Sequence, residues 1–339
     1  MTLVRLFTLL LMVLAGCIGL AIGFGFVGKV HGAFDSFSHF RLHLAVLLGL
    51  TGLTLLAIKC WRQGAMAVAL ALAAYTVTPG TTLNQLVGTH AQATPVNADL
   101  PHYRLVQFNA RYDNAIPEAF LSVVGQQRPD IITMQEVSAN WRAKLVPLAT
   151  AYPHQIICDP PSRIGGVAIL SRRPFVVGST PACHDRGMLA IASVDFGGLP
   201  VDIAAVHLLW PGPFEQPQQV ERLTGYLTGL SDAAILAGDF NAARWSETVR
   251  RLAAAASVSD AGPAGPSWLS GHLPISIIRF AGIGIDHVLA GRSINAHKVE
   301  RLPPAGSDHL PLLLEFSVQP KARQREIAGS QRGTVQINS

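Results

Sequence analysis

A run of 23 residues without a charged side chain, residues 6–28, limits what the start of this chain can become. About 20 consecutive apolar residues in a helix span the hydrocarbon core of a bilayer, and this run is long enough. Arg5 precedes it and Lys29 follows it. A cleaved signal peptide is the alternative. The run is long for a signal peptide and other apolar segments follow it, so we predict a membrane helix.

Two further apolar segments follow the first. Residues 42–58 are closed by Lys59 and Arg62, and residues 65–79 are rich in alanine and end at Pro79-Gly80. We predict a membrane region over 1–88 with about three transmembrane helices, at 6–28, 42–58 and 65–79. Residues 89–101 are small and polar and are predicted to be a linker to a separate domain over 102–318.

The basic residues indicate an orientation only weakly. A hairpin of the first two helices puts Arg5, Lys59 and Arg62 in the cytoplasm, against Lys29 and Arg41 outside. Three helices then place the later domain outside the cytoplasm, whereas two helices place it inside. We expect an integral protein of a bacterial inner (plasma) membrane with an extracytoplasmic domain. The one-charge difference leaves the number and orientation of the helices open.

The net charge of +5 comes from the two ends of the chain. Residues 1–100 and residues 319–339 each carry +3, which leaves −1 for residues 101–318. A domain without a basic excess gives little support for tight nonspecific binding to a nucleic-acid backbone. The basic end, 319–339, is predicted to be a disordered tail that is either solvated or in contact with anionic headgroups.

The cysteines argue against a zinc site. The chain has four, Cys17, Cys60, Cys158 and Cys183, and no two of them form a CxxC pair. A disulfide between Cys158 and Cys183 is compatible with an exported domain, but their spacing alone leaves it undecided.

The later domain alternates predicted strands and helices. Strands are predicted at 104–110, 130–135, 165–171, 189–196, 201–208, 235–238, 283–290 and 310–318. Helices are predicted at 114–127, with Asn114 as its cap, at 215–230 and at 245–256. Residues 257–282 are rich in Gly, Pro and Ser and are predicted to form a long irregular loop.

The stretch 235–242 combines a buried strand with polar residues at its end. Asp239 and Asn241 lie two apart, so an extended backbone would point both side chains the same way. Gly238 lets another backbone or a ligand approach closely. A plain Asx-type turn closing the strand is the alternative.

Polar residues recur at such strand ends, where an apolar strand would normally avoid them. They are Asn109, Glu136, His207, Asp239, Asn241, Asp286, Asp308 and His309. Carboxylates and amides without thiolates suit Mg²⁺ or Mn²⁺, and histidines supply proton transfer near neutral pH. This combination predicts metal-assisted attack of water on a phosphate ester.

Seven short motifs stand in the order typical of one enzyme family. They are Gln107-Phe-Asn109, Gln135-Glu136, Gly166-Val-Ala-Ile-Leu-Ser171, His207-Leu208, Gly238-Asp-Phe-Asn241, Ile285-Asp286-His287 and Ser307-Asp-His309. Over about 102–318 the chain resembles the endonuclease/exonuclease/phosphatase family, which includes deoxyribonucleases, abasic-site endonucleases, neutral sphingomyelinases and inositol-polyphosphate phosphatases. The resemblance implies an α/β (α+β) four-layer sandwich of two mixed β-sheets flanked by helices, here preceded by transmembrane helices.

The resemblance also implies how a metal would be held. Glu136 resembles the principal metal ligand of the family, assisted by Asn109 and Asp308. The implied cofactor is Mg²⁺ or Mn²⁺.

The remaining motif residues resemble the family's catalytic groups. Asp239 corresponds to the residue that orients or deprotonates water, and Asn241 to the one that holds a phosphate oxygen. His309 corresponds to the histidine on the phosphate, acting as base or as transition-state stabiliser, with Asp286 holding it in place. His207 corresponds to a histidine that protonates the leaving oxygen. Abasic-site enzymes tend to carry tyrosine there, so that branch is disfavoured. His287 receives no role.

We therefore expect a membrane-anchored, Mg²⁺-dependent phosphodiesterase. A lipid or other membrane-proximal phosphate ester is the preferred substrate, and DNA or RNA is the alternative. A non-catalytic, membrane-bound binding module is a third hypothesis, which the intact motifs disfavour. The sequence leaves open the substrate, the physiological metal, the oligomeric state and any protein partner.

Overall fold

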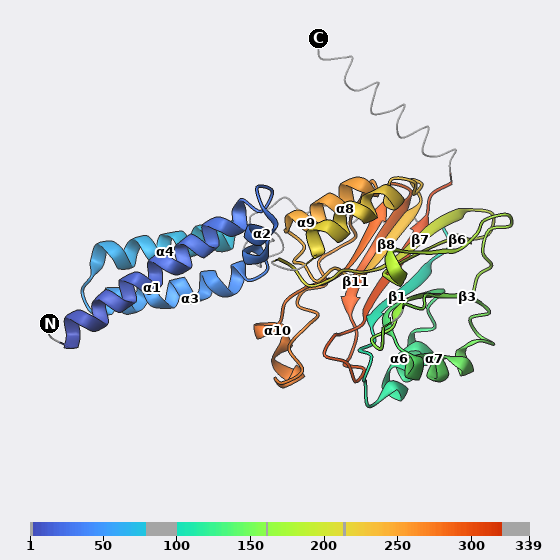
Figure 1. Ribbon diagram of the computed structural model, residues 1–339, viewed down its shortest axis with the longest axis horizontal. Coiled ribbons are helices and arrows are strands. Elements are labelled where there is room, and N and C mark those ends of the chain that lie inside the picture. Colours follow the sequence, from blue (N-terminus) through green and yellow to red (C-terminus); the bar gives the residue numbers. More distant parts are fainter. Residues whose placement is uncertain (1–2, 79–99, 161, 213–214, 321–339) are drawn as a thin grey trace, which may run out of the picture. The chain divides into compact units, whose positions relative to one another are not determined.

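The computed structural model describes residues 3–78, 100–160, 162–212 and 215–320. The chain divides into two compact units (Figure 1). The first contains residues 1–91 together with the later segments 209–217 and 242–250. The second contains residues 92–208, 218–241 and 251–339. Most of the predicted linker and residues 321–339 of the predicted tail lie outside the described residues.

The second unit contains two mixed six-stranded sheets. The order in the first sheet is β11-β12-β1-β2-β4-β3, where β1 and β2 are parallel and the other neighbours are antiparallel. Its strands are β1 (Tyr103–Asn109), β2 (Ile131–Val137), β3 (His154–Ile157), β4 (Gly166–Ser171), β11 (Ile294–Arg301) and β12 (Leu312–Val318).

The second sheet has the order β5-β6-β7-β8-β10-β9, where only β7 and β8 are parallel. Its strands are β5 (Ala182–His184), β6 (Leu189–Asp195), β7 (Pro200–His207), β8 (Ala234–Asp239), β9 (Val258–Asp260) and β10 (Asp286–Gly291). In both sheets the single parallel pair brings two strand carboxyl ends to one edge.

The two sheets pack face to face over a shared apolar core. Leu105, Ile131 and Ile169 from the first sheet belong to the same buried cluster as Ile203 and Ile235 from the second. Because successive side chains alternate between faces, the neighbours of these residues point to the opposite side of each sheet. Each sheet therefore needs a second cover, which helices supply.

Helices α6 (Pro117–Gln127) and α7 (Ala139–Leu145) cover the outer face of the first sheet, followed by a short 3-10 helix, η1 (Val146–Leu148). Phe120 of α6 and Trp141 of α7 join Phe108 of β1 in a second buried cluster. Helix α8 (Gln216–Leu227) buries Val220, Leu223 and Leu227. The unit is an α/β fold of two mixed sheets flanked by helices, as predicted.

Helix α6 differs in detail from the prediction. It begins with Pro117 at its first turn, where a missing N–H costs nothing, and its N-cap is Ile116. Asn114 is therefore not the cap. Its Oδ1 instead accepts from Ile116 N (2.8 Å), which closes a turn just before the helix. The helix ends at Gln127, and the residue after it, Arg128, has the left-handed conformation ahead of Pro129.

The short elements were not predicted. Strands β3, β5 and β11 were missed, and the supposedly irregular stretch 257–282 contains β9, a 3-10 helix η3 (Ile275–Ile277) and α10 (Ile278–Ala281). These elements are three to eight residues long, and most of β11 is only half-buried at a sheet edge. They lack the apolar alternation on which strand prediction depends.

A disulfide between Cys158 and Cys183 joins the edges of the two sheets. Cys158 follows β3, the edge strand of the first sheet, and Cys183 lies in β5, the edge strand of the second. The two Cα atoms are 5.7 Å apart, within the usual range for a disulfide. The pairing left undecided by the sequence is therefore present.

The first unit is built on a helical bundle. Its helices are α1 (Leu3–Phe26), α2 (Gly32–Ser38), α3 (Arg41–Ala57) and α4 (Trp61–Thr76). Ile18 and Ile22 of α1 pack with Leu48 of α3 and Ala71 of α4. Helices α3 and α4 approach closely at Gly64, where a Cβ would lie 2.8 Å from the Gly52 carbonyl oxygen. Helix α2 was not predicted.

Among the described helices, α1 is long and apolar enough to cross a membrane. Helices α2 and α3 pass the same test only if counted as one span bent by 64°. Helix α4, with 16 residues, is about 24 Å long, short of a typical 30 Å hydrocarbon core. The three transmembrane spans therefore remain a prediction.

The two later segments of the first unit contact α2. Asp35 accepts hydrogen bonds from Glu247 N and Thr248 N, and His39 Nδ1, just after α2, accepts one from Ala243 N. Glu247 begins α9 (Glu247–Ala255). Ser36 Oγ donates to the Gly212 carbonyl oxygen (2.9 Å).

Candidate active site

Three neighbouring strands of the second sheet place polar residues side by side. In the strand register, Asp239 at the end of β8 lies opposite His207 of β7 on one side and Asp286 of β10 on the other. Gly238 permits the close approach of β7, because a Cβ at this position would overlap the Val206 carbonyl oxygen. The glycine before Asp239 thus accommodates a neighbouring backbone.

The turn after Asp239 is an Asx turn that also positions a polar side chain. Asp239 Oδ1 accepts from Asn241 N (2.8 Å), and Asn241 has a left-handed backbone with φ of 44°. Asn241 Nδ2 donates to the Leu208 carbonyl oxygen (2.7 Å). The prediction that an extended backbone points Asp239 and Asn241 the same way was wrong. The extended backbone ends at Asp239, and the turn after it places Asn241.

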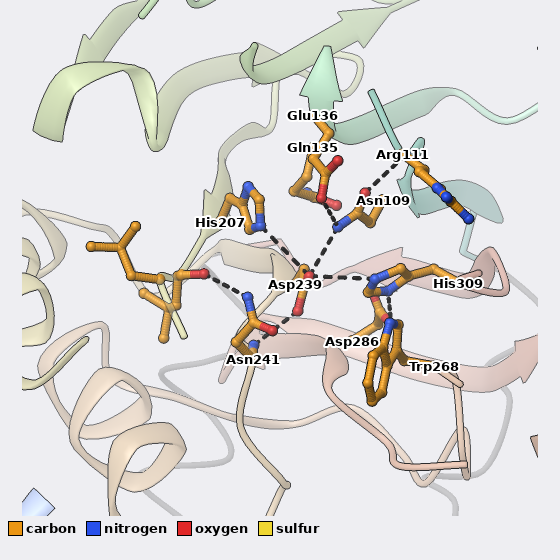
Figure 2. Close-up of polar contacts among 12 residues, drawn as sticks. Asn109, Arg111, Gln135, Glu136, His207, Asp239, Asn241, Trp268, Asp286 and His309 are labelled. Carbon is orange, nitrogen blue, oxygen red and sulfur yellow. Dashed lines mark hydrogen bonds and ion pairs between the residues drawn. The ribbon is translucent and has the colours of Figure 1, made fainter. Parts of the chain in front are cut away.

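The first sheet contributes Asn109 and Glu136 at the ends of its parallel pair. Asn109 Nδ2 donates to Glu136 Oε1 (3.1 Å) and to Asp239 Oδ2 (2.9 Å), so one amide links the carboxylates of the two sheets (Figure 2). Glu136 Oε2 accepts from Tyr112 N (3.0 Å). Glu136 has a φ of 59° within an irregularity of β2 between Met134 and Val137, which turns its side chain toward the strand end.

His309 completes the group beside Asp239. Its Nδ1 lies 2.9 Å from Asp286 Oδ2, and its Nε2 lies 3.7 Å from Asp239 Oδ2. An ionised carboxylate only accepts hydrogen bonds, so Nδ1 donates to Asp286. Asp286 also accepts from Ser267 Oγ (2.6 Å) and Gln107 Nε2 (3.1 Å).

Burial and charge shift the acid–base properties of these groups. Burial raises the pKa of Asp239 to about 6, against the opposing charges of His309 and His207. Burial would lower the pKa of His309, but Asp286 and Asp239 outweigh it and raise the pKa to about 10. Burial would likewise raise the pKa of Asp286, yet the charge of His309 and the hydrogen bonds from His309, Ser267 and Gln107 lower it.

His207 and Asp308 lie at the edges of this group. His207 Nε2 is 3.7 Å from Asp239 Oδ2, and its carbonyl oxygen accepts from Gln219 Nε2 (3.1 Å). Asp308 Oδ2 accepts from Trp268 Nε1 (3.3 Å). The structure thus brings seven of the eight predicted residues into one hydrogen-bonded or closely charged group around Asp239. Asp308 lies beside this group, where its side chain accepts from Trp268 and Ser307 and its charge helps to raise the pKa of His309.

Several residues that hold the site received no role from the sequence. Gln107 lies two residues before Asn109, so it shares its face of β1, and this spacing was the available signal. Ser267 and Trp268 come from a loop without any pattern. Arg111 N donates to Asn109 Oδ1 (3.0 Å), and a hydrogen bond to Asp113, followed by the charges of Asp308 and Glu136, raises the pKa of Arg111.

The donor set fits a hard divalent cation. Glu136 and Asp239 flank the same amide nitrogen, and carboxylate and amide oxygens are the ligands that Mg²⁺ and Mn²⁺ prefer. Asp239, Asp286 and His309 also offer ligand atoms within 4.8 Å of one another. However, His309 Nδ1 already donates to Asp286, so this trio is held together by its own hydrogen bond. The Glu136 side of the site is the better candidate for the metal.

The comparisons agree with this arrangement. The sequence profile of the endonuclease/exonuclease/phosphatase family matches residues 106–309, which is more than half of the chain. The chain belongs to this family. Its members are metal-dependent phosphoester hydrolases, which makes the chain an enzyme of that class. The matched range begins within β1 and ends at His309, so it spans the whole site.

Solved structures of the family share the fold. A family protein from Bacteroides vulgatus is 17% identical with a TM-score of 0.53, over 65% of this chain and 100% of that one. D. rerio TDP2 complexed with a single-strand DNA product is 17% identical with a TM-score of 0.52, over 64% and 99%. An AP endonuclease from Archaeoglobus fulgidus is 19% identical with a TM-score of 0.50, over 62% and 98%. The comparison with curated protein sequences gave no match.

Proposed function

We propose that the chain is a membrane-anchored, Mg²⁺-dependent phosphodiesterase. The observation that carries this proposal is the buried Asp239 carboxylate, which lies between two histidines and shares the Asn109 amide with Glu136. Such a group brings together a carboxylate base, a positively charged histidine and oxygen ligands for a divalent metal within a few ångströms. This combination suits attack of water on a phosphate ester.

Asp239 takes the role of the base in this proposal. Its raised pKa of about 6 leaves it mostly ionised at neutral pH, yet basic enough to accept a proton from an attacking water. The hydrogen bond from Asn241 N to Oδ1 fixes the carboxylate, so that Oδ2 faces the site.

His309 takes the role of a transition-state stabiliser. The sequence left open whether it acts as base or as stabiliser. Its raised pKa keeps it protonated at neutral pH, and its Nδ1–H is already donated to Asp286, so Nε2–H is free to donate to a phosphate oxygen. His207 is the proposed donor to the leaving oxygen.

Glu136 and Asn109 would hold the metal, with Asp308 as a third candidate. The bound cation would supply charge for the phosphate oxygens in the transition state. Around it, the hydrogen bond from Tyr112 N to Glu136 Oε2 and that from Arg111 N to Asn109 Oδ1 hold the two side chains in place.

A membrane-proximal phosphodiester is the preferred substrate class. An apolar helix of 24 residues, α1, supports anchoring, and the net charge of −1 over 101–318 does not favour tight nucleic-acid binding. DNA or RNA is the second candidate, favoured by the fold shared with an AP endonuclease and with TDP2 in complex with a DNA product.

The experiment compares substrates side by side. The full-length protein in nanodiscs, with Mg²⁺, is given plasmid DNA, a single-stranded oligonucleotide and vesicles of phospholipid and sphingomyelin. His309→Ala and Glu136→Gln serve as controls. Headgroup release that is lost in both variants supports the proposal, whereas DNA cleavage with the same loss makes the chain a tethered nuclease. Binding of any of these without hydrolysis, unchanged in Glu136→Gln, would instead support a binding module.

We further propose that the catalytic unit faces the side of a bacterial inner membrane opposite the cytoplasm. The disulfide Cys158–Cys183 supports an oxidising compartment. Asp35 accepts hydrogen bonds from Glu247 and Thr248, so residues 32–39 and segment 242–250 should lie on the same side of the membrane. This requires that α3 and α4 either both cross the membrane or both stay on one side. Alkaline-phosphatase fusions after Thr78 and after Cys60 test this orientation: the Thr78 fusion should be active, and the Cys60 fusion should be inactive if α3 and α4 both cross the membrane and active if neither does. An inactive Thr78 fusion contradicts the orientation.

A further inference from the structure

The two loops that leave the proposed active site both continue into contacts with helix α2. The chain after His207 and Leu208 becomes segment 209–217, and the chain after Asp239 and Asn241 becomes segment 242–250. Both segments belong to the first unit together with α2. An apolar N-terminal region that served only as a membrane anchor would not require contacts between α2 and the two segments that follow the active-site strands.

The contacts to segment 242–250 are made by buried polar groups. Asp35 is 5% exposed, and its two oxygens accept from Glu247 N (2.8 Å) and Thr248 N (2.9 Å) at the start of α9. A carboxylate at a helix N-terminus satisfies unpaired N–H groups and interacts favourably with the helix dipole. Asp35 thus fixes where α9 begins, eight residues after Asp239.

His39 binds the same segment at a residue nearer in the chain to Asp239 and Asn241. It is 4% exposed, and its Nδ1 accepts from Ala243 N (3.2 Å), two residues after Asn241. Trp245 Nε1 donates to the Ser38 carbonyl oxygen (2.7 Å). Asn241 itself has a left-handed backbone, and the hydrogen bond at Ala243 restrains the chain two residues after it.

The second loop is held at the same helix. Ser36 Oγ donates to the Gly212 carbonyl oxygen (2.9 Å), and a Cβ at Gly32 would lie 3.5 Å from Pro217 Cβ. The two loops also meet at the site, because Asn241 Nδ2 donates to the Leu208 carbonyl oxygen. One short helix therefore restrains the segments that follow both β7 and β8.

We propose that Asp35 and His39 are positioning residues for the phosphodiesterase reaction, acting on Asp239 and Asn241 through segment 242–250. This inference rests on the proposed function for its kinetic consequence. The connection between the first two apolar helices thereby restrains the chain segments that follow two strands of the proposed active site. A shift of about 1 Å in a catalytic group costs roughly 100-fold in rate, so loss of one restraint lowers kcat without altering the chemistry itself.

The kinetic test uses the full-length protein in nanodiscs with Mg²⁺ and bis(p-nitrophenyl) phosphate. We expect His39→Ala and Asp35→Ala to lower kcat about tenfold or more, with KM changed less than about threefold. His39→Asn, which keeps an acceptor for Ala243 N, should recover most of the lost kcat. Lys29→Ala, an exposed change in the same connection, is the matched control and should behave as wild type. A kcat that is unchanged, or that falls only with the fraction of folded protein, overturns the proposal.

Amide exchange measured by mass spectrometry tests the coupling without catalysis. In His39→Ala, exchange should rise over residues 239–243, including Asn241 N, whose own acceptor on Asp239 is untouched. Lys29→Ala should show no rise. If the wild type hydrolyses no phosphodiester, the proposed function fails, and exchange still decides this inference. Unchanged exchange over 239–243 in His39→Ala overturns it.

A cross-link tests the contact itself. The double variant Gly32→Cys with Pro217→Cys, with Cys17 and Cys60 changed to Ser, places the two Cβ atoms at about the separation of a disulfide. We expect a cross-link under mild oxidation with activity retained. Absence of a cross-link in the folded protein overturns the placement of α2 on which the inference depends.

Discussion

His309 Nδ1 lies 2.9 Å from Asp286 Oδ2, and the two side chains are almost completely buried. Asp286 is itself held by Ser267 and Gln107, so its position does not depend on the histidine. Asp286 therefore sets the orientation of the His309 ring and directs Nε2 toward Asp239. The contributions of His309 and Asp286 to the reaction can therefore be measured separately by mutating each residue.

His309→Ala should lower kcat about 10³-fold, because it removes the proposed donor to the phosphate. Asp286→Asn keeps the shape but removes the negative charge that orients the His309 ring and keeps it protonated, and it should cost at least about 10²-fold. Steady-state hydrolysis of a small phosphodiester measures both. Asp232→Asn, an exposed carboxylate paired with Arg292, is the matched control and should leave kcat unchanged. Equal rates for Asp286→Asn and wild type would contradict the orienting role.

Activity should follow a bell-shaped pH profile. The acid limb reflects Asp239, which must be ionised and whose pKa is raised to about 6, so activity falls as the pH drops below that value. The alkaline limb reflects His309, which must be protonated and whose pKa is raised to about 10, so activity falls as the pH rises toward that value. Asp286→Asn removes the charge that raises the pKa of His309 and should move the alkaline limb to lower pH. An alkaline limb that stays in place in this variant would rule out His309 as its source.

Glu136→Gln should lower metal-dependent activity by at least about 10²-fold, because the principal carboxylate ligand becomes a neutral amide of similar shape. Mn²⁺ binding, followed by electron paramagnetic resonance, should weaken in parallel. Chelation of the wild type should abolish activity, and added Mg²⁺ should restore it. Glu221→Gln on the exposed side of α8 is the control. Undiminished Mn²⁺ affinity in Glu136→Gln would move the metal site elsewhere.

Loss of the disulfide should destabilise the protein. The bond closes a loop with a sequence separation of 25 residues and joins the edge strands of the two sheets, so its removal should cost roughly 3 kcal/mol in the free energy of unfolding. Thermal unfolding of Cys158→Ser with Cys183→Ser measures the loss. Reducing agent should destabilise the wild type but not the double variant. A wild type indifferent to reducing agent would mean that the bond does not form.

Gly238→Ala should prevent stable folding of the catalytic unit. The added methyl group would overlap the Val206 carbonyl oxygen in the neighbouring strand, and a backbone carbonyl in a sheet cannot move aside as a flexible side chain does. We expect a loss above about 4 kcal/mol, measured by denaturant unfolding or by the yield of folded protein. Gly125→Ala, in α6 with open space at its Cβ, is the control and should be neutral or stabilising. A folded and active Gly238→Ala protein would contradict the close packing of β7 and β8.

The residue types of the site follow from the sequence because the chemistry restricts them. A hard metal and an attacking water require carboxylates, amides and histidines, and these stand out when they interrupt apolar strands, as at Asn109, Glu136 and Asp239. The same holds for the first apolar run, since a bilayer thickness imposes a minimum length. Local patterns of this kind need no knowledge of distant contacts.

The tertiary structure decided how these residues meet and what supports them. Ser267 comes from an unpatterned loop, yet it holds Asp286. Asn241 reaches its place through a left-handed turn. Asp35, 212 residues before Glu247 in the chain, binds the start of α9. The contacts of Ser267 and Asp35 depend on partners far along the sequence, and the sequence offered the turn at Asn241 only as an alternative to an extended strand. The sequence by itself therefore determined the chemistry and the segments that carry it, whereas long-range hydrogen bonding determined the geometry, because a local pattern holds no information about distant partners.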